Sequence, residues 1–82
     1  MYLSIGDHVI IDKNSLIGIF DIGIYSKSIV NRRFLKYAEQ ENNVVHLDSD
    51  EHIKTIIVTT EKIYLSSTTH NTLFKRFVNS YI

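Results

Sequence analysis

The shortness of the chain is the feature that most constrains its fold. With 82 residues, the chain has no room for two separate hydrophobic cores, so we expect a single domain over residues 1–82. Folding at this length hides only about 60 to 65% of the surface of the unfolded chain, which leaves a narrow margin of stability. Self-association is a natural supplement to such a small core, and the length therefore favours a homo-oligomer.

The chain contains no cysteine. This excludes disulfides, thiolate zinc sites and a cysteine nucleophile, and it is typical of proteins in a reducing compartment. The amino terminus lacks the basic and long apolar segments of a signal peptide, and no apolar run approaches the ~20 residues that a membrane span requires. We therefore expect a cytoplasmic protein that does not associate with membranes.

The charged residues are balanced in number but segregated along the sequence. Nine basic and nine acidic residues cancel, so the net charge does not by itself indicate a nucleic-acid partner. Residues 27–36 carry only cations, namely Lys27, Arg32, Arg33 and Lys36, whereas residues 39–51 carry acids and neither Lys nor Arg. Any basic surface on this protein must therefore be local.

Short apolar runs rich in β-branched residues predict five to six strands. These runs cover residues 9–11, 16–20, 44–47, 53–59 and 62–65, with a less distinct run at 2–5. The runs at 9–11 and 16–20 flank a turn-prone segment, so we expect them to pair. The run at 53–59 has the strongest β-propensity, and we expect it to be central and to form a hairpin with 62–65.

Two segments have helical periodicity. Ser26 is the expected N-cap of a helix over residues 27–40, which places Arg32, Arg33 and Lys36 opposite an apolar side made of Val30, Phe34, Leu35, Tyr37 and Ala38. A second helix begins near the N-cap Thr69 and carries one apolar arc made of Leu73, Phe74, Phe77, Val78 and Tyr81. The fold class predicted is α+β, with a single-layer mixed or antiparallel sheet of five to six short strands and two helices.

Catalytic and metal-binding motifs are weak in this sequence. There is no Gly-rich phosphate loop and no Gly-x-Ser-x-Gly motif, so we expect no enzymatic activity and no cofactor. One cluster has metal-ligand chemistry, namely His46, Asp48, Asp50, Glu51 and His52. Its spacing fits neither a calcium loop nor a zinc site, and it favours a solvated acidic loop.

Several longer segments resemble one known family. Residues 16–21, 33–39, 54–59 and 63–67, in this order, are similar to the RemA/RemB family of extracellular matrix regulatory proteins, and most similar to its shorter RemB branch. The similarity extends over nearly the whole chain, which makes it more specific than any short motif. The resemblance implies a DNA-binding regulator of biofilm matrix genes in Gram-positive bacteria, and the RemA branch implies assembly into a ring-shaped homo-oligomer that presents positive charge to DNA.

The sequence departs from the RemA pattern just before the expected central strand. Where RemA carries an arginine pair followed by a third arginine, this chain has Glu51 and His52, followed by Lys54. An acid at that position repels phosphate and weakens a DNA-binding site there.

Seven cations are candidate phosphate contacts: Lys27, Arg32, Arg33, Lys36, Lys54, Lys75 and Arg76. The alternative for the first four is a solvated helix face, and the alternative for Lys54 is a strand-edge lysine that prevents wrong sheet pairing. Lys75 and Arg76 contribute only if the last helix faces the same side. Phe74, Phe77 and Tyr81 are candidates for an oligomer interface, with an ordinary core as the alternative.

Two functions from different classes fit these observations. The first is a homo-oligomeric regulator that binds double-stranded DNA mainly through its backbone and shape, because a closed ring repeats each cation in every subunit. The second is an oligomeric protein-interaction module of the same fold that has lost DNA binding and contacts a paralogous or regulatory protein. Glu51 and His52 favour the second.

Overall fold

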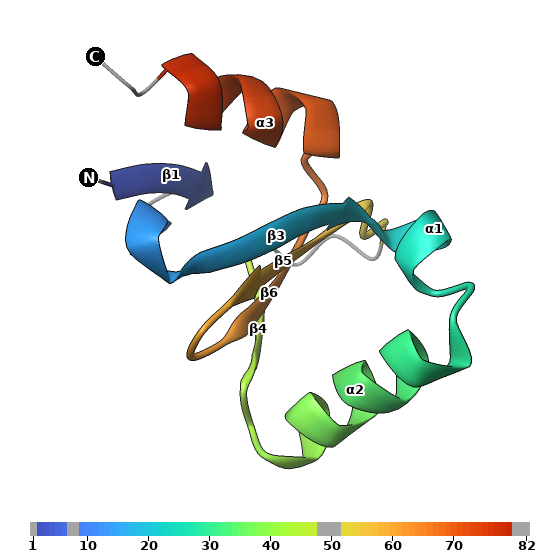
Figure 1. Ribbon diagram of the computed structural model, residues 1–82. Helices are drawn as coiled ribbons and strands as arrows, with labels where there is room; N and C mark the ends of the chain where they lie inside the picture. The colour runs from blue at the N-terminus through green and yellow to red at the C-terminus, as the bar shows by residue number, and fades with distance from the viewer. Residues whose placement is uncertain (1, 7–8, 48–51, 80–82) are drawn as a thin grey trace.

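The computed structural model describes residues 2–6, 9–47 and 52–79 of the chain, and within these the fold is α+β (Figure 1). The strands are β1 (Tyr2–Gly6), β2 (Val9–Asp12), β3 (Leu16–Asp21), β4 (Val44–His46), β5 (Thr55–Thr59) and β6 (Ile63–Ser66). The helices are α1 (Ile22–Tyr25), α2 (Ile29–Gln40) and α3 (His70–Asn79), with a 3₁₀ turn over Lys13–Ser15. The expected α+β class is confirmed.

The strands form two sheets rather than the single sheet predicted. β1 pairs with β2 in a small antiparallel sheet, and β3 pairs instead with β5. The predicted pairing of residues 9–11 with 16–20 is therefore wrong. The connection between them is a 3₁₀ turn in which the Asp12 carboxylate accepts a hydrogen bond from the Asn14 amide at 2.9 Å. This turn sends the chain from one sheet into the other rather than back along β2.

The larger sheet has the order β3-β5-β6-β4 and is mixed, because β4 runs parallel to β6 while the other neighbours are antiparallel. β5 is an inner strand whose five residues are all buried, so the central strand and its hairpin with β6 are confirmed. The threonine at the end of β5 closes this hairpin: the Thr59 hydroxyl donates to the Lys62 carbonyl at 2.6 Å and accepts from the Lys62 amide at 3.0 Å.

Side chains alternate between the two faces of β5, and each face builds its own core. Ile56 and Val58 pack with Tyr25 and Ala38 on the side of α1 and α2. Ile57 packs with Leu73 and with apolar side chains of the small sheet on the side of α3. Figure 1 shows α2 and α3 on opposite sides of the larger sheet. The domain therefore has three layers: α1 and α2, the larger sheet, and a layer made of α3 and the small sheet.

The chain between β3 and α2 differs from the prediction in two ways. A short helix, α1, follows β3 directly because the Asp21 carboxylate caps it, accepting a hydrogen bond from the Ile24 amide at 3.1 Å. The long helix begins at Ile29 rather than at residue 27, and its N-cap is Ser28 rather than Ser26. The Ser28 hydroxyl accepts from the Asn31 amide at 3.3 Å, while Ser26 ends α1.

The end of α2 is set by an asparagine in the left-handed conformation, Asn42, with φ of 60°. The Asn43 amide donates to the Ala38 carbonyl at 2.9 Å, and the Asn42 amide donates to the Glu39 carbonyl at 3.1 Å. These two bonds are those of a Schellman motif, which satisfies carbonyls that the helix leaves without partners. The predicted end of the helix near residues 41–43 is confirmed.

Only part of the predicted apolar side of α2 meets the sheet: Leu35 and Ala38 do, and Val30, Phe34 and Tyr37 do not. Ala38 is buried, and Leu35 and Asn31 are half-buried, whereas Val30, Phe34 and Tyr37 are exposed. The packed positions follow one another at helical spacing, and they lie about a quarter turn from the exposed apolar positions. Small and polar side chains on the packed stripe let the helix approach the sheet, so the larger apolar residues were misassigned to the core.

Candidate nucleic-acid interface

The four cations of the first group lie on α2 and the turn before it, and all four are exposed. Arg32 is partly committed to the local structure, because its guanidinium donates to the Ser26 carbonyl at 2.6 Å. Arg33 and Lys36 lie on the side of α2 away from the packed stripe. These two cations are therefore the part of the predicted basic stripe that is best placed for a partner in solution.

The basic surface covers only part of α2. Glu39 and Glu41 follow it along the helix, and both are exposed. Phosphate would be attracted to the amino-terminal part of the helix and repelled at its carboxyl-terminal end.

Lys54 lies immediately before β5, where the backbone is held on both sides. Its amide donates to the Ser66 carbonyl and its carbonyl accepts from the Ile22 amide, each at 2.9 Å. The side chain is exposed, as is that of His52. The structure therefore fixes the position of Lys54 beside α1. An exposed side chain at this place fits a phosphate contact and also fits a strand-edge lysine that prevents wrong sheet pairing. Glu51, like Asp48 and Asp50 of the predicted acidic loop, lies outside the described residues.

Lys75 and Arg76 form a second group on α3. Both are exposed, and with Leu3, Ser4, Thr72 and Asn79 they line an open groove of about 460 Å³ between α3 and β1. Because α3 and α2 lie on opposite sides of the larger sheet, these cations do not join those of α2 in one subunit (Figure 1). The expectation that they contribute to the same surface holds only if neighbouring subunits bring the two sides together.

The three predicted interface residues differ in their surroundings. Phe74 is 60% exposed and lies beside β3, where it lines an apolar groove of about 300 Å³. Phe77 instead packs against the core on this side, and the Lys13 ammonium lies 4.7 Å from its ring centroid. Lys13 also donates to the Phe77 carbonyl at 2.8 Å, close to the carboxyl end of α3, where a cation is favourable. Tyr81 lies outside the described residues.

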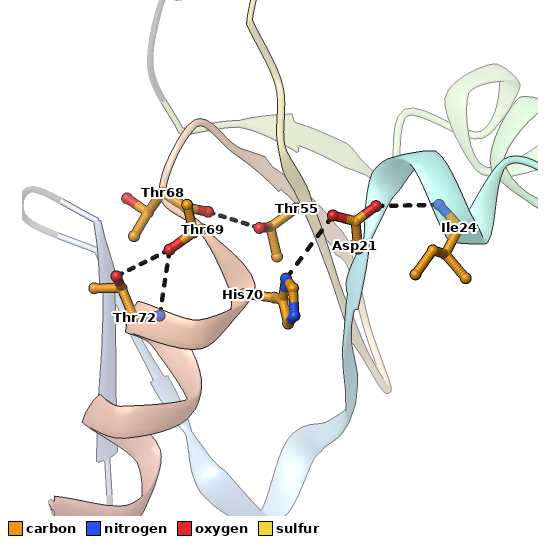
Figure 2. Close-up of polar contacts among 7 residues, drawn as sticks. All are labelled: Asp21, Ile24, Thr55, Thr68, Thr69, His70 and Thr72. Atoms are coloured by element: carbon orange, nitrogen blue, oxygen red, sulfur yellow. Dashed lines mark hydrogen bonds and ion pairs between the residues drawn. The ribbon is translucent and has the colours of Figure 1, made fainter.

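The start of α3 is tied to β5 and β3 by polar side chains (Figure 2). The Thr69 hydroxyl accepts from the Thr72 amide at 3.4 Å, which confirms the predicted N-cap. The Thr55 hydroxyl donates to the Thr68 carbonyl at 2.6 Å, and the His70 imidazole lies 3.9 Å from the Asp21 carboxylate. These contacts fix the position of α3 on the sheet.

A groove of about 410 Å³ runs along β3 beside α1 and is mostly apolar. Its polar members are Asp21, which caps α1, Asn31, whose side-chain amide donates to the Tyr25 carbonyl at 3.1 Å, and His70, whose imidazole lies 3.9 Å from the Asp21 carboxylate. Burial raises the pKa of the Tyr25 phenol above its ordinary value. The hydrogen bond from Asn31 to the Tyr25 carbonyl positions α1 against α2.

Sequence reasoning did not find the exposed apolar residues of α2. The predicted apolar side joined two neighbouring stripes, and only one of them faces the sheet. A signal was present in the sequence, since Asn31, Leu35 and Ala38 already form a stripe of the width that one sheet face covers.

Two sheets, helices on both sides of the larger one, and exposed cations on α2 and α3 define a small α+β domain with accessible charged surfaces. A comparison with protein families matches residues 2–77 to the RemA-like family, described as extracellular matrix regulatory protein A-like. The chain belongs to this family, and the family's name supports a role in extracellular matrix regulation. A search of curated proteins found no match. Within the described residues, no helix is long and apolar enough to cross a membrane.

Proposed function

We propose that this protein is a cytoplasmic, homo-oligomeric DNA-binding regulator of biofilm and extracellular matrix gene expression, from the RemB branch of its family. Membership of the RemA-like family supports the regulatory role. The observation that carries the DNA-binding part is the exposure of Arg33 and Lys36 on the free side of α2, within a run of sequence that has cations and no acids. The proposed function involves no catalysis and no cofactor.

The mechanism follows from repetition of a modest charge. A single subunit has no net charge, so its attraction to DNA is local and weak. In a closed ring every subunit would present the same pair of cations, and the pairs would form a continuous positive band. Such a band contacts phosphates rather than base edges, and it favours DNA that bends around the ring at low elastic cost.

A specific observation favours a second candidate, an oligomeric protein-interaction module. The apolar side chains of Val30, Phe34 and Tyr37 are exposed on the same helix as the cations. Exposed apolar groups of this kind favour a protein partner over DNA phosphates. The acid Glu51 in place of an expected arginine favours the same alternative.

Binding to nonspecific duplex DNA over a series of salt concentrations tests the proposal. We expect the parent protein to bind at low salt and to lose affinity as salt rises, because phosphate contacts release counterions. In the double variant Arg33→Ala and Lys36→Ala, the binding should weaken, and the slope of log affinity against log salt should fall by about 2.

A matched control is the double variant Lys75→Ala and Arg76→Ala, which removes the same charge from the opposite side of the sheet. If α2 faces DNA, this variant should bind nearly as well as the parent. An equal loss in both variants would mean that both sides contact DNA in the assembly. Absence of binding by the parent at low salt would reject the DNA-binding proposal and favour the interaction module.

The residues before β5 allow a second test of DNA binding. Replacing Glu51 and His52 with arginine should tighten binding at low salt, and the gain should disappear as salt rises. If affinity does not change at any salt concentration, these residues lie away from DNA.

A further inference from the structure

Three of the four large exposed apolar side chains of α2 form a continuous stripe, and the fourth, Ile29, lies outside it. Val30 is 73% exposed, Phe34 47% and Tyr37 63%, and they follow one another at the spacing of residues that share one helix face. The neighbouring stripe of Asn31, Leu35 and Ala38 faces the larger sheet. The stripe of Val30, Phe34 and Tyr37 therefore lies along the flank of the domain, where a second helix has access to it.

The charges on α2 are arranged against the preference of a single helix. Acids are favoured at the amino end of a helix and cations at the carboxyl end, because of the helix dipole. The first turn of α2 has no acid and the last turn has no base. Instead, Lys27 lies just before the amino end, and Glu39 and Glu41 lie in the last turn and at the C-cap. The charged side chains thus add to the helix dipole rather than offset it.

An antiparallel neighbour of the same sequence offsets this arrangement. In such a pair the basic end of each helix lies beside the acidic end of the other, and the two helix dipoles oppose one another. Phe34 lies midway between Lys27 and Glu41 in the sequence. A twofold axis near Phe34 would therefore bring Lys27 of each copy toward Glu41 of the other, and Val30 toward Tyr37.

We propose that the stripe of Val30, Phe34 and Tyr37 docks against the same stripe of a second copy of this chain, with the two α2 helices antiparallel about a twofold axis near Phe34. The proposal deepens the proposed function, because it rests on the homo-oligomer and names one of its contacts. Lys36 lies well away from this stripe on α2, so the contact leaves it accessible to DNA, whereas Arg33 lies beside Tyr37 at the rim of the contact. Phe74 on α3 also stays free for a different contact, which a closed ring built from such pairs requires.

Cysteine cross-linking tests the twofold contact directly. The chain has no native cysteine, so the variant Phe34→Cys carries a single thiol. At the twofold axis the two thiols are close enough for a disulfide, which needs Cα atoms within about 7 Å. The matched control is Glu39→Cys, which is exposed on the other side of the same helix. We expect oxidation of the purified protein to yield a covalent dimer mainly with Phe34→Cys.

Charge reversal tests the direction of the two helices. Lys27→Glu and Glu41→Lys should each weaken self-association in low-salt buffer by roughly five-fold, measured by sedimentation equilibrium, because each creates two repulsive pairs per dimer. The double variant should recover most of the loss, since the attraction is restored in reverse. Circular dichroism checks that all variants fold, which is expected because the replaced side chains are exposed.

The outcomes separate this inference from the proposed function, because both measurements are made without DNA. Equal cross-linking of Phe34→Cys and Glu39→Cys, or a double charge variant no better than the single ones, would overturn the inference. A purified parent protein that stays monomeric would overturn it as well. Efficient cross-linking through Phe34 in a protein that does not bind DNA would support the inference and reject only the DNA-binding proposal.

Discussion

The helices on the two sides of the larger sheet are anchored by different kinds of side chain. On one side, α3 contributes a fully buried leucine, Leu73, and packs with the small sheet into a core of its own. On the other side, α2 buries only Ala38 and leaves four larger apolar side chains in solvent, namely those of Ile29, Val30, Phe34 and Tyr37. The comparison teaches that α3 is anchored by one large, fully buried side chain and leaves Phe74 and Val78 exposed, whereas α2 is anchored by a small side chain and leaves a longer apolar stripe exposed for a partner.

The largest difference is expected from truncating one leucine on each side. Leu73→Ala should lower the free energy of unfolding by about 2 to 5 kcal/mol, because it leaves a cavity in a closed core. Leu35→Ala on α2 should cost about 1 to 2 kcal/mol, because that side chain is only half-buried. Urea unfolding at one protein concentration measures both, since self-association makes stability depend on concentration. Equal losses would show that α2 is packed as firmly as α3.

The helix caps offer a finer probe of the same difference. Ser28→Ala and Thr69→Ala each remove a hydroxyl that accepts an amide hydrogen bond, at a cost of about 1 kcal/mol. On α2 we expect this cost to appear as local opening, with amide hydrogen exchange of the helix accelerated by about five-fold. On α3 the amides should continue to exchange through global unfolding. The comparison would be wrong if the Ser28 variant exchanged no faster in α2 than elsewhere.

The smallest effect is expected at high pH and concerns Tyr25, which is buried on the α2 side. Burial raises its pKa above the ordinary value of 10.0, so the unfolded chain loses this proton first. Below pH 10.0 the phenol is neutral in both states and has no effect on pH dependence. As pH rises above 10.0 toward the folded-state pKa, stability should fall.

The variant Tyr25→Phe should lose this part of the alkaline destabilisation, measured by urea unfolding at neutral and alkaline pH. Tyr37→Phe is the matched control, because Tyr37 is exposed on the neighbouring helix. If Tyr25→Phe loses as much stability at alkaline pH as the parent and the control do, water reaches the Tyr25 phenolate in the folded protein and this prediction is wrong.

Local sequence signals predicted the elements well where one physical cause dominates. β5 is a continuous β-branched run, and its burial on both faces makes it central whatever surrounds it. The start of α3 and the end of α2 were also predicted, because Thr69 and the asparagines after Glu41 satisfy backbone groups through contacts close in sequence. The family resemblance, which rests on the order of whole segments, is confirmed by the match over residues 2–77.

Only the tertiary structure decided which elements meet. The runs at β2 and β3 are both apolar and adjacent in sequence, but β2 pairs with β1 and β3 pairs with the buried strand β5, so the chain forms two sheets. Contacts with the sheet also decided which face of α2 is buried. Ala38 and Leu35 pack against the sheet, and the larger side chains of Phe34 and Tyr37 remain exposed. Helical periodicity shows that residues share a face, but the depth available above a sheet determines which face is buried, and that depth is set by residues distant in sequence.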